Sequence, residues 1–156
     1  MLISEKIFEY VMINNILVPY DFTNFGDLAF EKAIEIAKKF DSKLTLLTVI
    51  GSDVDTSNMS LTRAQEMHDE SENKAKEDLN KIKNSAKMKN IPISVEIIHN
   101  SSNSEGILSF SEKDNTDLIV MGSHGRSGFK KLVLGSVASQ VVTKAKCPVL
   151  IVKSSK

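Results

Sequence analysis

The sequence predicts an α/β domain in which a five-stranded parallel sheet is covered by helices on both faces, a three-layer sandwich. Apolar segments of strand length alternate with segments of helical periodicity along the chain, and these apolar segments are nearly continuous. Continuous apolar strands are typical of a sheet buried on both sides, and strands that alternate with helices pair in parallel through right-handed crossovers. The 156 residues, 41% of them hydrophobic and 26% charged, suffice for one such domain with a buried core.

The first half of the chain supplies two strands and two helices. Residues 15–21 (NILVPYD) are a short apolar run that ends in a loop, which predicts a buried strand. The helix that follows has Asn24 as its expected N-cap. Its apolar face consists of Phe30, Ala33, Ile34, Ala37 and Phe40. Residues 43–50 (KLTLLTVI) predict a central strand. A polar loop then leads to a long helix whose apolar stripe consists of Ala75, Leu79, Ile82 and Ala86.

The second half continues the alternation to a fifth strand. Residues 91–98 (IPISVEII) and 116–122 (TDLIVMG) predict the third and fourth strands, with a helix over 101–113 between them. The last helix opens at Ser136, and its apolar positions are Val137, Val141, Val142 and Ala145. Residues 148–153 (PVLIVK) close the chain as the fifth strand.

Charge and cysteine content exclude several classes of function. Twenty basic and twenty acidic side chains cancel, so no overall field attracts the chain to nucleic acid or to an anionic membrane. The N-terminus has no apolar stretch long enough for a signal peptide, and its acidic residues argue against a transit peptide, so we expect a cytoplasmic protein. We interpret residues 1–12 as an N-terminal extension and 13–153 as a single domain. The one cysteine, Cys147, cannot form an internal disulfide and is expected to be a small buried residue.

Four of the seven glycines fall within residues 122–135, between the fourth strand and the last helix. This segment contains neither a P-loop nor a dinucleotide fingerprint. Gly122 and Gly125 let the chain leave the strand with exposed peptide N–H groups. Gly135 and Ser136 place bare backbone and a hydroxyl at the start of a helix, where anions are favoured. Each half alone could be a plain turn or an ordinary N-cap, but together they favour phosphate binding.

The motif G-x-x-G-x(9)-G-S begins in DLIVMGSHGRSG and ends in LVLGSVASQVV, and CPVLIVK comes after it. Together these segments resemble the ATP-binding subgroup of the universal stress protein family. The opening ILVPYDFT is similar to that family's first strand and loop, so that the resemblance spans roughly residues 13–153. It implies a Rossmann-like sheet with strand order 3-2-1-4-5, a homodimer, and bound ATP in one subgroup. In this arrangement the strand order reverses between strands one and four, and open parallel sheets bind ligands beyond the carboxyl ends of the strands at such a point. Asp21 and Gly122 would then face each other across a crevice.

The resemblance implies roles for individual residues. Asp21 matches the acid beside the adenosine, Val49 the residue whose backbone meets the adenine, and Met121 a residue that lines the base pocket. The matching phosphate cradle consists of Gly122, Gly125, Gly135 and Ser136.

Other residues near the motif fit the resemblance less closely. Arg126 is a candidate counter-charge to the phosphates. His124 could be an acid or a phosphate ligand, but a lone histidine in a glycine turn more often orients its neighbours, and we assign it that role. Residues 101–103 (SSN) replace a G-x-P turn that is frequent in the family, which affects the expected contacts to the sugar. His68 and His99 match nothing and receive no role.

These observations predict a regulatory stress-response protein that binds ATP, ADP or AMP, with Mg²⁺ beside the phosphates. It would act through a nucleotide-dependent homodimer and a further protein partner. In the implied order the fifth strand is an edge that is apolar on both faces, which favours pairing with a second copy. One alternative is a slow ATPase or phosphotransferase, although no residue stands out as a base near the γ-phosphate. Another is an interaction module without nucleotide, in which the glycines only shape a turn.

Overall fold

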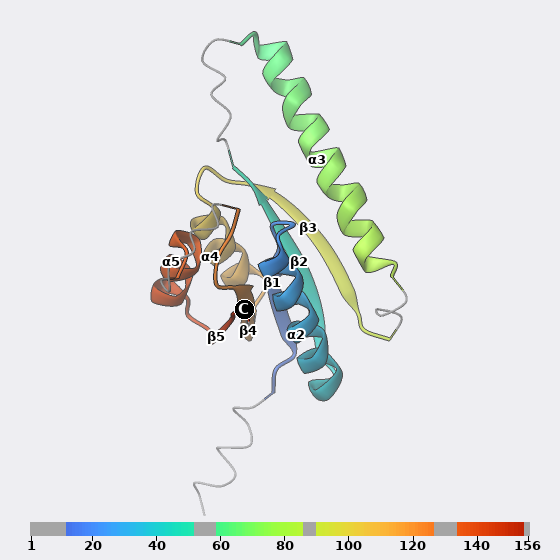
Figure 1. Cartoon of the computed structure of the whole chain (residues 1–156), viewed down its shortest axis with the longest axis vertical. Coiled ribbons are helices and arrows are strands. Elements are labelled where there is room, and N and C mark those ends of the chain that lie inside the picture. Colours follow the sequence, from blue (N-terminus) through green and yellow to red (C-terminus); the bar gives the residue numbers. More distant parts are fainter. Residues whose placement is uncertain (1–11, 52–58, 86–89, 127–133, 155–156) are drawn as a thin grey trace, which may run out of the picture.

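The computed structural model describes residues 12–51, 59–85, 90–126 and 134–154. Along these ranges strands and helices alternate (Figure 1). The strands are β1 (Asn15–Pro19), β2 (Lys43–Ile50), β3 (Ile93–His99), β4 (Leu118–Gly122) and β5 (Val149–Val152). The helices are α2 (Asn24–Phe40), α3 (Leu61–Lys83), α4 (Asn103–Lys113) and α5 (Ser136–Lys144).

All five strands form one parallel sheet in the order β3-β2-β1-β4-β5. The predicted fold class and the strand order implied by the family resemblance are therefore confirmed. Because β1 pairs with β2 on one side and with β4 on the other, the order reverses at the carboxyl end of β1. Open parallel sheets bind their ligands at this kind of position.

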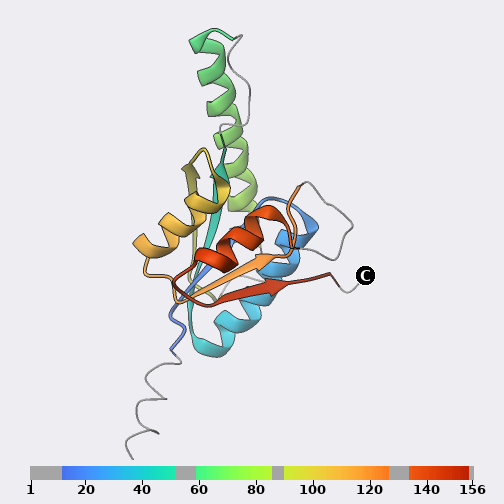
Figure 2. The ribbon, with the colours of Figure 1, turned by 90° about the vertical axis from the view of Figure 1, so that its left-hand side faces the viewer.

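Helices cover both faces of the sheet, with α2 and α3 on one face and α4 and α5 on the other (Figure 2). Successive strand residues point to opposite faces. Val18 and Val120 thus pack under α2, whereas Leu17 and Ile119 pack under α4 and α5. Burial on both faces is the reason why the strands are apolar at nearly every position.

Two predicted details of the helices are wrong. The N-cap of α2 is Thr23, whose side chain accepts a hydrogen bond from Gly26 N, and Asn24 is the first helical residue. Phe40 is 43% exposed, because α2 ends there and the chain turns away at Asp41 in the left-handed conformation. The stripe of α3 is as predicted at Ala75 and Leu79, which are buried.

Some predictions fall on residues that the structure does not describe. These include the N-terminal extension up to residue 11 and Ala86 at the end of the predicted stripe. Within the described ranges, no helix has both the length and the apolar character needed to cross a bilayer.

Candidate functional site

The loop after β1 holds Asp21 at the reversal point of the sheet. Its Oδ1 accepts hydrogen bonds from Thr23 N at 3.2 Å and from Thr23 Oγ1 at 2.6 Å. Thr23 Oγ1 in turn accepts from Gly26 N at 3.2 Å, which caps α2. The side chain of Asp21 is therefore fixed by the first turn of the helix that follows it. Phe22 between them has φ 63°, a left-handed conformation that is uncommon for a bulky residue.

Gly122 ends β4 directly against the first turn of α2. A Cβ atom added at Gly122 would lie 2.7 Å from Phe25 Cβ and 2.8 Å from Phe25 O. These distances are too short for any side chain, so α2 can pack over the end of β4 only if residue 122 is glycine. Gly122 thus has a packing role that the sequence motif does not reveal.

Gly125 and Arg126 lie next to Asp21, on the other side of the reversal point. A Cβ at Gly125 would lie 3.1 Å from Asp21 Oδ2. Arg126 Nε donates to the backbone carbonyl of Asp21 at 3.3 Å. The loops after β1 and β4 therefore meet, as the strand order requires.

The second half of the glycine motif contacts the first half. Gly135 N donates to Ser123 O at 2.8 Å, and a Cβ at Gly135 would lie 3.8 Å from Gly125 N. Gly135 is the N-cap of α5 and offers no side chain to cap it, whereas α2, α3 and α4 are capped by Thr23, Ser60 and Ser102. Ser136 is exposed in the first turn of α5. The alternative interpretation of Ser136 as an ordinary N-cap is therefore wrong, and its hydroxyl does not cap the helix.

Val49 and Met121 belong to the apolar cluster under α4 and α5, Met121 buried and Val49 partly buried. Leu47 is the last β2 residue paired with β1, and its carbonyl accepts from Tyr20 N. The N–H and C=O groups of alternate residues point to the same side of a strand. The backbone of Val49 therefore points to the β1 side, two residues beyond the end of the ladder.

The turn before α4 is built from hydroxyl and amide groups. Ser102 N donates to Asn100 Oδ1 at 2.9 Å, and Ser102 caps α4. Ser104 Oγ donates to Gln140 Oε1 at 2.8 Å, which joins the start of α4 to α5. Residues 101–103, which replace the G-x-P turn that the resemblance implied, thus form a hydrogen-bonded turn at the carboxyl end of β3.

Comparison with known proteins decides the family. The model of the universal stress protein family matches residues 12–153. The chain belongs to the universal stress protein family. Its sequence is 34% identical to universal stress protein YxiE of Bacillus subtilis over 149 residues, which cover 91% of this chain and all of YxiE. It is 32% identical to universal stress protein MJ0531 of Methanocaldococcus jannaschii over 145 residues, 93% of this chain and 85% of that protein.

Solved structures agree with this assignment. The structure of MJ0577 superposes with a TM-score of 0.83 at 28% identity and covers 94% of this chain and 99% of its own. UspA from Lactobacillus plantarum gives 0.80 at 25% identity, with 91% and 99% covered. A universal stress protein in complex with cAMP shares the fold at 20% identity and a TM-score of 0.60, with 92% and 99% covered.

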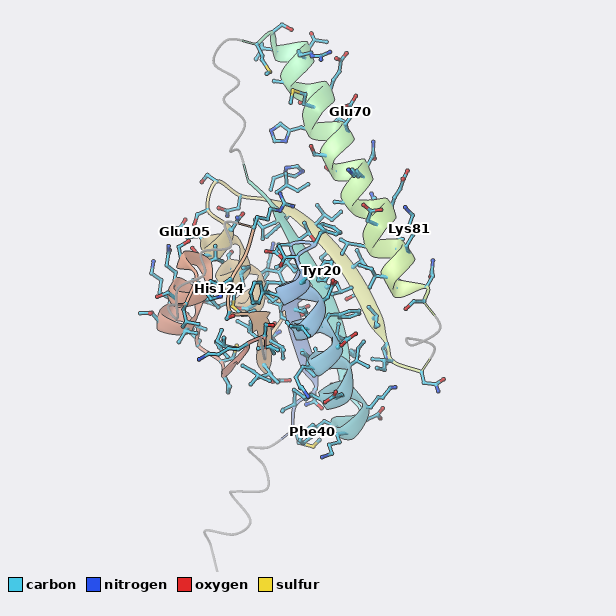
Figure 3. All side chains as sticks on the ribbon, viewed as in Figure 1. Tyr20, Phe40, Glu70, Lys81, Glu105 and His124 are labelled. Carbon is cyan, nitrogen blue, oxygen red and sulfur yellow. The ribbon has the colours of Figure 1, made fainter. Side chains whose placement is uncertain are left out.

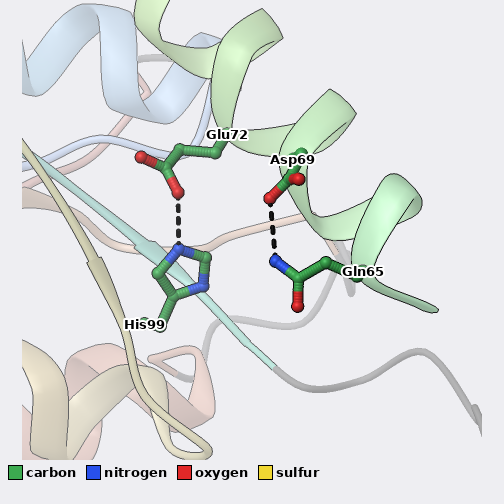
Figure 4. Close-up of polar contacts among 4 residues, drawn as sticks. All are labelled: Gln65, Asp69, Glu72 and His99. Atoms are coloured by element: carbon green, nitrogen blue, oxygen red, sulfur yellow. Dashed lines mark hydrogen bonds and ion pairs between the residues drawn. The ribbon is translucent and has the colours of Figure 1, made fainter. Parts of the chain in front are cut away.

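This universal stress protein also brings together residues that received no role from the sequence. His99 Nε2 at the end of β3 lies 2.9 Å from Glu72 Oε2 on α3 (Figure 4). The His68 ring contacts the His99 ring edge-on with centroids 5.4 Å apart. The hydrogen bond to His99 lowers the pKa of Glu72. No sequence signal indicates this contact, because it depends on how α3 lies against β3.

Among the residues that the structure describes, no three histidine, cysteine or acidic side chains are grouped so that they could hold a metal ion. Cys147 is half-buried against the cluster under α4 and α5, and burial raises the pKa of its thiol. A raised pKa disfavours the reactive thiolate, in keeping with a packing role.

Proposed function

We propose that this universal stress protein binds an adenine nucleotide, ATP in the first place, at the reversal point of its sheet and acts in the stress response as a nucleotide-dependent regulator in the cytoplasm. One observation carries the proposal. Asp21, Gly125 and Gly135 converge from the ends of β1 and β4 and from the start of α5. The start of α5 lacks a capping side chain, so its first N–H groups and the helix dipole favour a phosphate there.

The apolar residues Val49 and Met121 near the same reversal point suit the binding of a nucleobase. Val49 directs its backbone N–H and C=O toward the gap beyond β1, and a nucleobase edge carries matching acceptors and donors. Met121 lies buried in the same apolar cluster. Asp21, Val49 and Met121 would thus bind the nucleoside, while Gly122, Gly125, Gly135 and Ser136 surround the phosphates and Arg126 supplies counter-charge. Mg²⁺ would be held mainly by the phosphates themselves.

Calorimetry with ATP, AMP, cAMP and adenosine, each with Mg²⁺, tests the proposal. We expect ATP to bind. Ser136→Ala should weaken binding by about 1–3 kcal/mol because it removes a hydroxyl that bonds a charged oxygen. Gly125→Leu should block it, because a side chain there would occupy the space beside Asp21.

Ser139→Ala is the matched control, since Ser139 lies on the same helix, is exposed and is one turn further from the N-terminus. We expect it to bind like the wild type. If millimolar ATP and AMP leave no calorimetric signal with the wild-type protein, the proposed function is wrong. Cyclic AMP is tested because a universal stress protein of the same fold was solved in complex with cAMP.

A further inference from the structure

His124 carries a buried nitrogen without a partner. Its Nδ1 lies 3.0 Å from Ser123 Oγ, in keeping with the orienting role assigned from the sequence. Its Nε2 is buried and has no hydrogen-bond partner within the described part of the chain. Buried polar atoms nearly always have a partner, and each exception calls for an explanation such as a missing ligand or water.

The surroundings of His124 belong to the proposed phosphate site. In Figure 3, His124 lies beyond the end of β4, between α2 and the layer formed by α4 and α5. His124 belongs to the first half of the glycine motif, and a Cβ at Gly135 would lie 3.3 Å from His124 Cα, so its backbone is next to the second half. On its other side the His124 ring is 5.3 Å from the Phe25 ring. An aromatic face is a much weaker acceptor than an oxygen atom.

The hydrogen bond to Ser123 bears on which nitrogen holds the proton. Ser123 is only 3% exposed, so its hydroxyl has little access to water. Either the hydroxyl or Nδ1–H can donate in this bond, and we assign the hydroxyl as the donor. When Nδ1 accepts, a neutral imidazole carries its proton on Nε2. Nε2 is then a donor that lacks an acceptor. The acceptor that the glycine motif is suited to bring is an anionic oxygen.

We propose that His124 is a phosphate-binding residue, whose Nε2–H donates to a phosphate oxygen of the nucleotide while Nδ1 accepts from Ser123. The inference rests on the proposed nucleotide site and extends it to a residue outside the motif glycines. Because Nε2 is covered in this arrangement, the contact forms only when the covering groups move. Binding and local rearrangement are therefore coupled, since the contact exists in one arrangement and not in the other.

Nitrogen-15 NMR of the histidine side chains tests the proton position and the contact, at about pH 8 where free imidazole is neutral. We expect His124, identified by the signals lost in His124→Gln, to be protonated on Nε2. Its Nε2 signal should move on addition of ATP but not of adenosine. His68 and His99, on α3 and β3, serve as internal references. Protonation on Nδ1, or an equal response to adenosine, would overturn the inference.

Two variants of His124 distinguish the role of Nδ1 from that of Nε2. His124→Asn places an amide near Nδ1, so it retains an acceptor for Ser123 and has nothing at Nε2, whereas His124→Gln extends an amide donor toward Nε2. We expect ATP affinity to fall about tenfold or more in the first and to recover in the second, with equal melting temperatures. Unchanged affinity in His124→Asn, or equal losses in two folded variants, would contradict the inference. If the wild type binds no ATP by calorimetry, both the proposed function and this inference are wrong.

Discussion

Gly122 is glycine at a point where the fold leaves no space for a side chain. The space where its Cβ would lie is filled by Phe25 of α2, so the first turn of the helix approaches the end of β4 closely. This approach also brings Phe25 against His124. A glycine that the motif associates with phosphate is therefore required by the fold even without a ligand.

The Tyr20 phenol makes the stability of the fold depend on pH. Burial and the hydrogen bond from its hydroxyl to Asp27 Oδ1 raise the pKa of the Tyr20 phenol above its ordinary value. A raised folded-state pKa means that this stabilisation is complete below the unfolded pKa, about 10, and declines as pH rises beyond it. Tyr20→Phe should cost about 0.5–1.5 kcal/mol at neutral pH but should remove this alkaline loss.

Urea denaturation of the wild type and Tyr20→Phe at neutral pH and above about pH 10 measures the difference. The gap in unfolding free energy between the two proteins should narrow as pH rises. Equal alkaline losses in both proteins would show that the Tyr20 phenol does not contribute to the pH dependence.

The stability of helix α2 depends on its N-cap. Thr23 caps the helix and also donates to Asp21, so Thr23→Ala should lower the unfolding free energy by about 1 kcal/mol. Asn24→Ala, one residue later at an exposed helical position, is the control and should leave stability nearly unchanged. Chemical denaturation distinguishes the two, and the reverse ranking would mean that the cap assignment is wrong.

In the whole molecule, β5 is an edge strand of the sheet. Leu150 is 36% exposed, and the other β5 residues are half-buried. Ser123 N donates to Val152 O, so Val152 directs its backbone toward β4. Ile151, one residue earlier, therefore directs its N–H outward. We infer a homodimer that pairs two β5 strands, and the outward N–H of Ile151 is the group that such pairing would use.

Ile151→Pro removes this outward donor and leaves the β4–β5 ladder intact, since proline is tolerated where the N–H faces away from the sheet. We expect it to sediment as a folded monomer, while Ile151→Ala, which loses the side chain but keeps the N–H, remains dimeric. Val152→Pro should instead lower the stability of the fold, because its N–H faces β4. Wild-type protein that sediments as a monomer at tens of micromolar, with and without ATP, would rule out this dimer.

Hydrophobic patterning along the chain was enough to predict the number, type and succession of the strands and helices. Burial on both faces makes a parallel strand apolar along its whole length, and this pattern can be seen at residues 43–50 and 116–122 without any structure. The spaced glycines likewise identified the family and placed Gly125, Gly135 and Ser136 at one edge of the sheet. These features are local in the chain, or follow from strand order alone.

Contacts between distant segments could not be predicted from the sequence. Thr23 rather than Asn24 caps α2, and the same side chain donates to Asp21 and so fixes its position. The pairing of His99 with Glu72 and the burial of His124 Nε2 depend on how helices lie on the sheet. Hydrophobic periodicity fixes which face of a helix is buried, but packing of particular side chains fixes its rotation and distance. Which polar atoms have hydrogen-bond partners therefore depends on how the side chains pack.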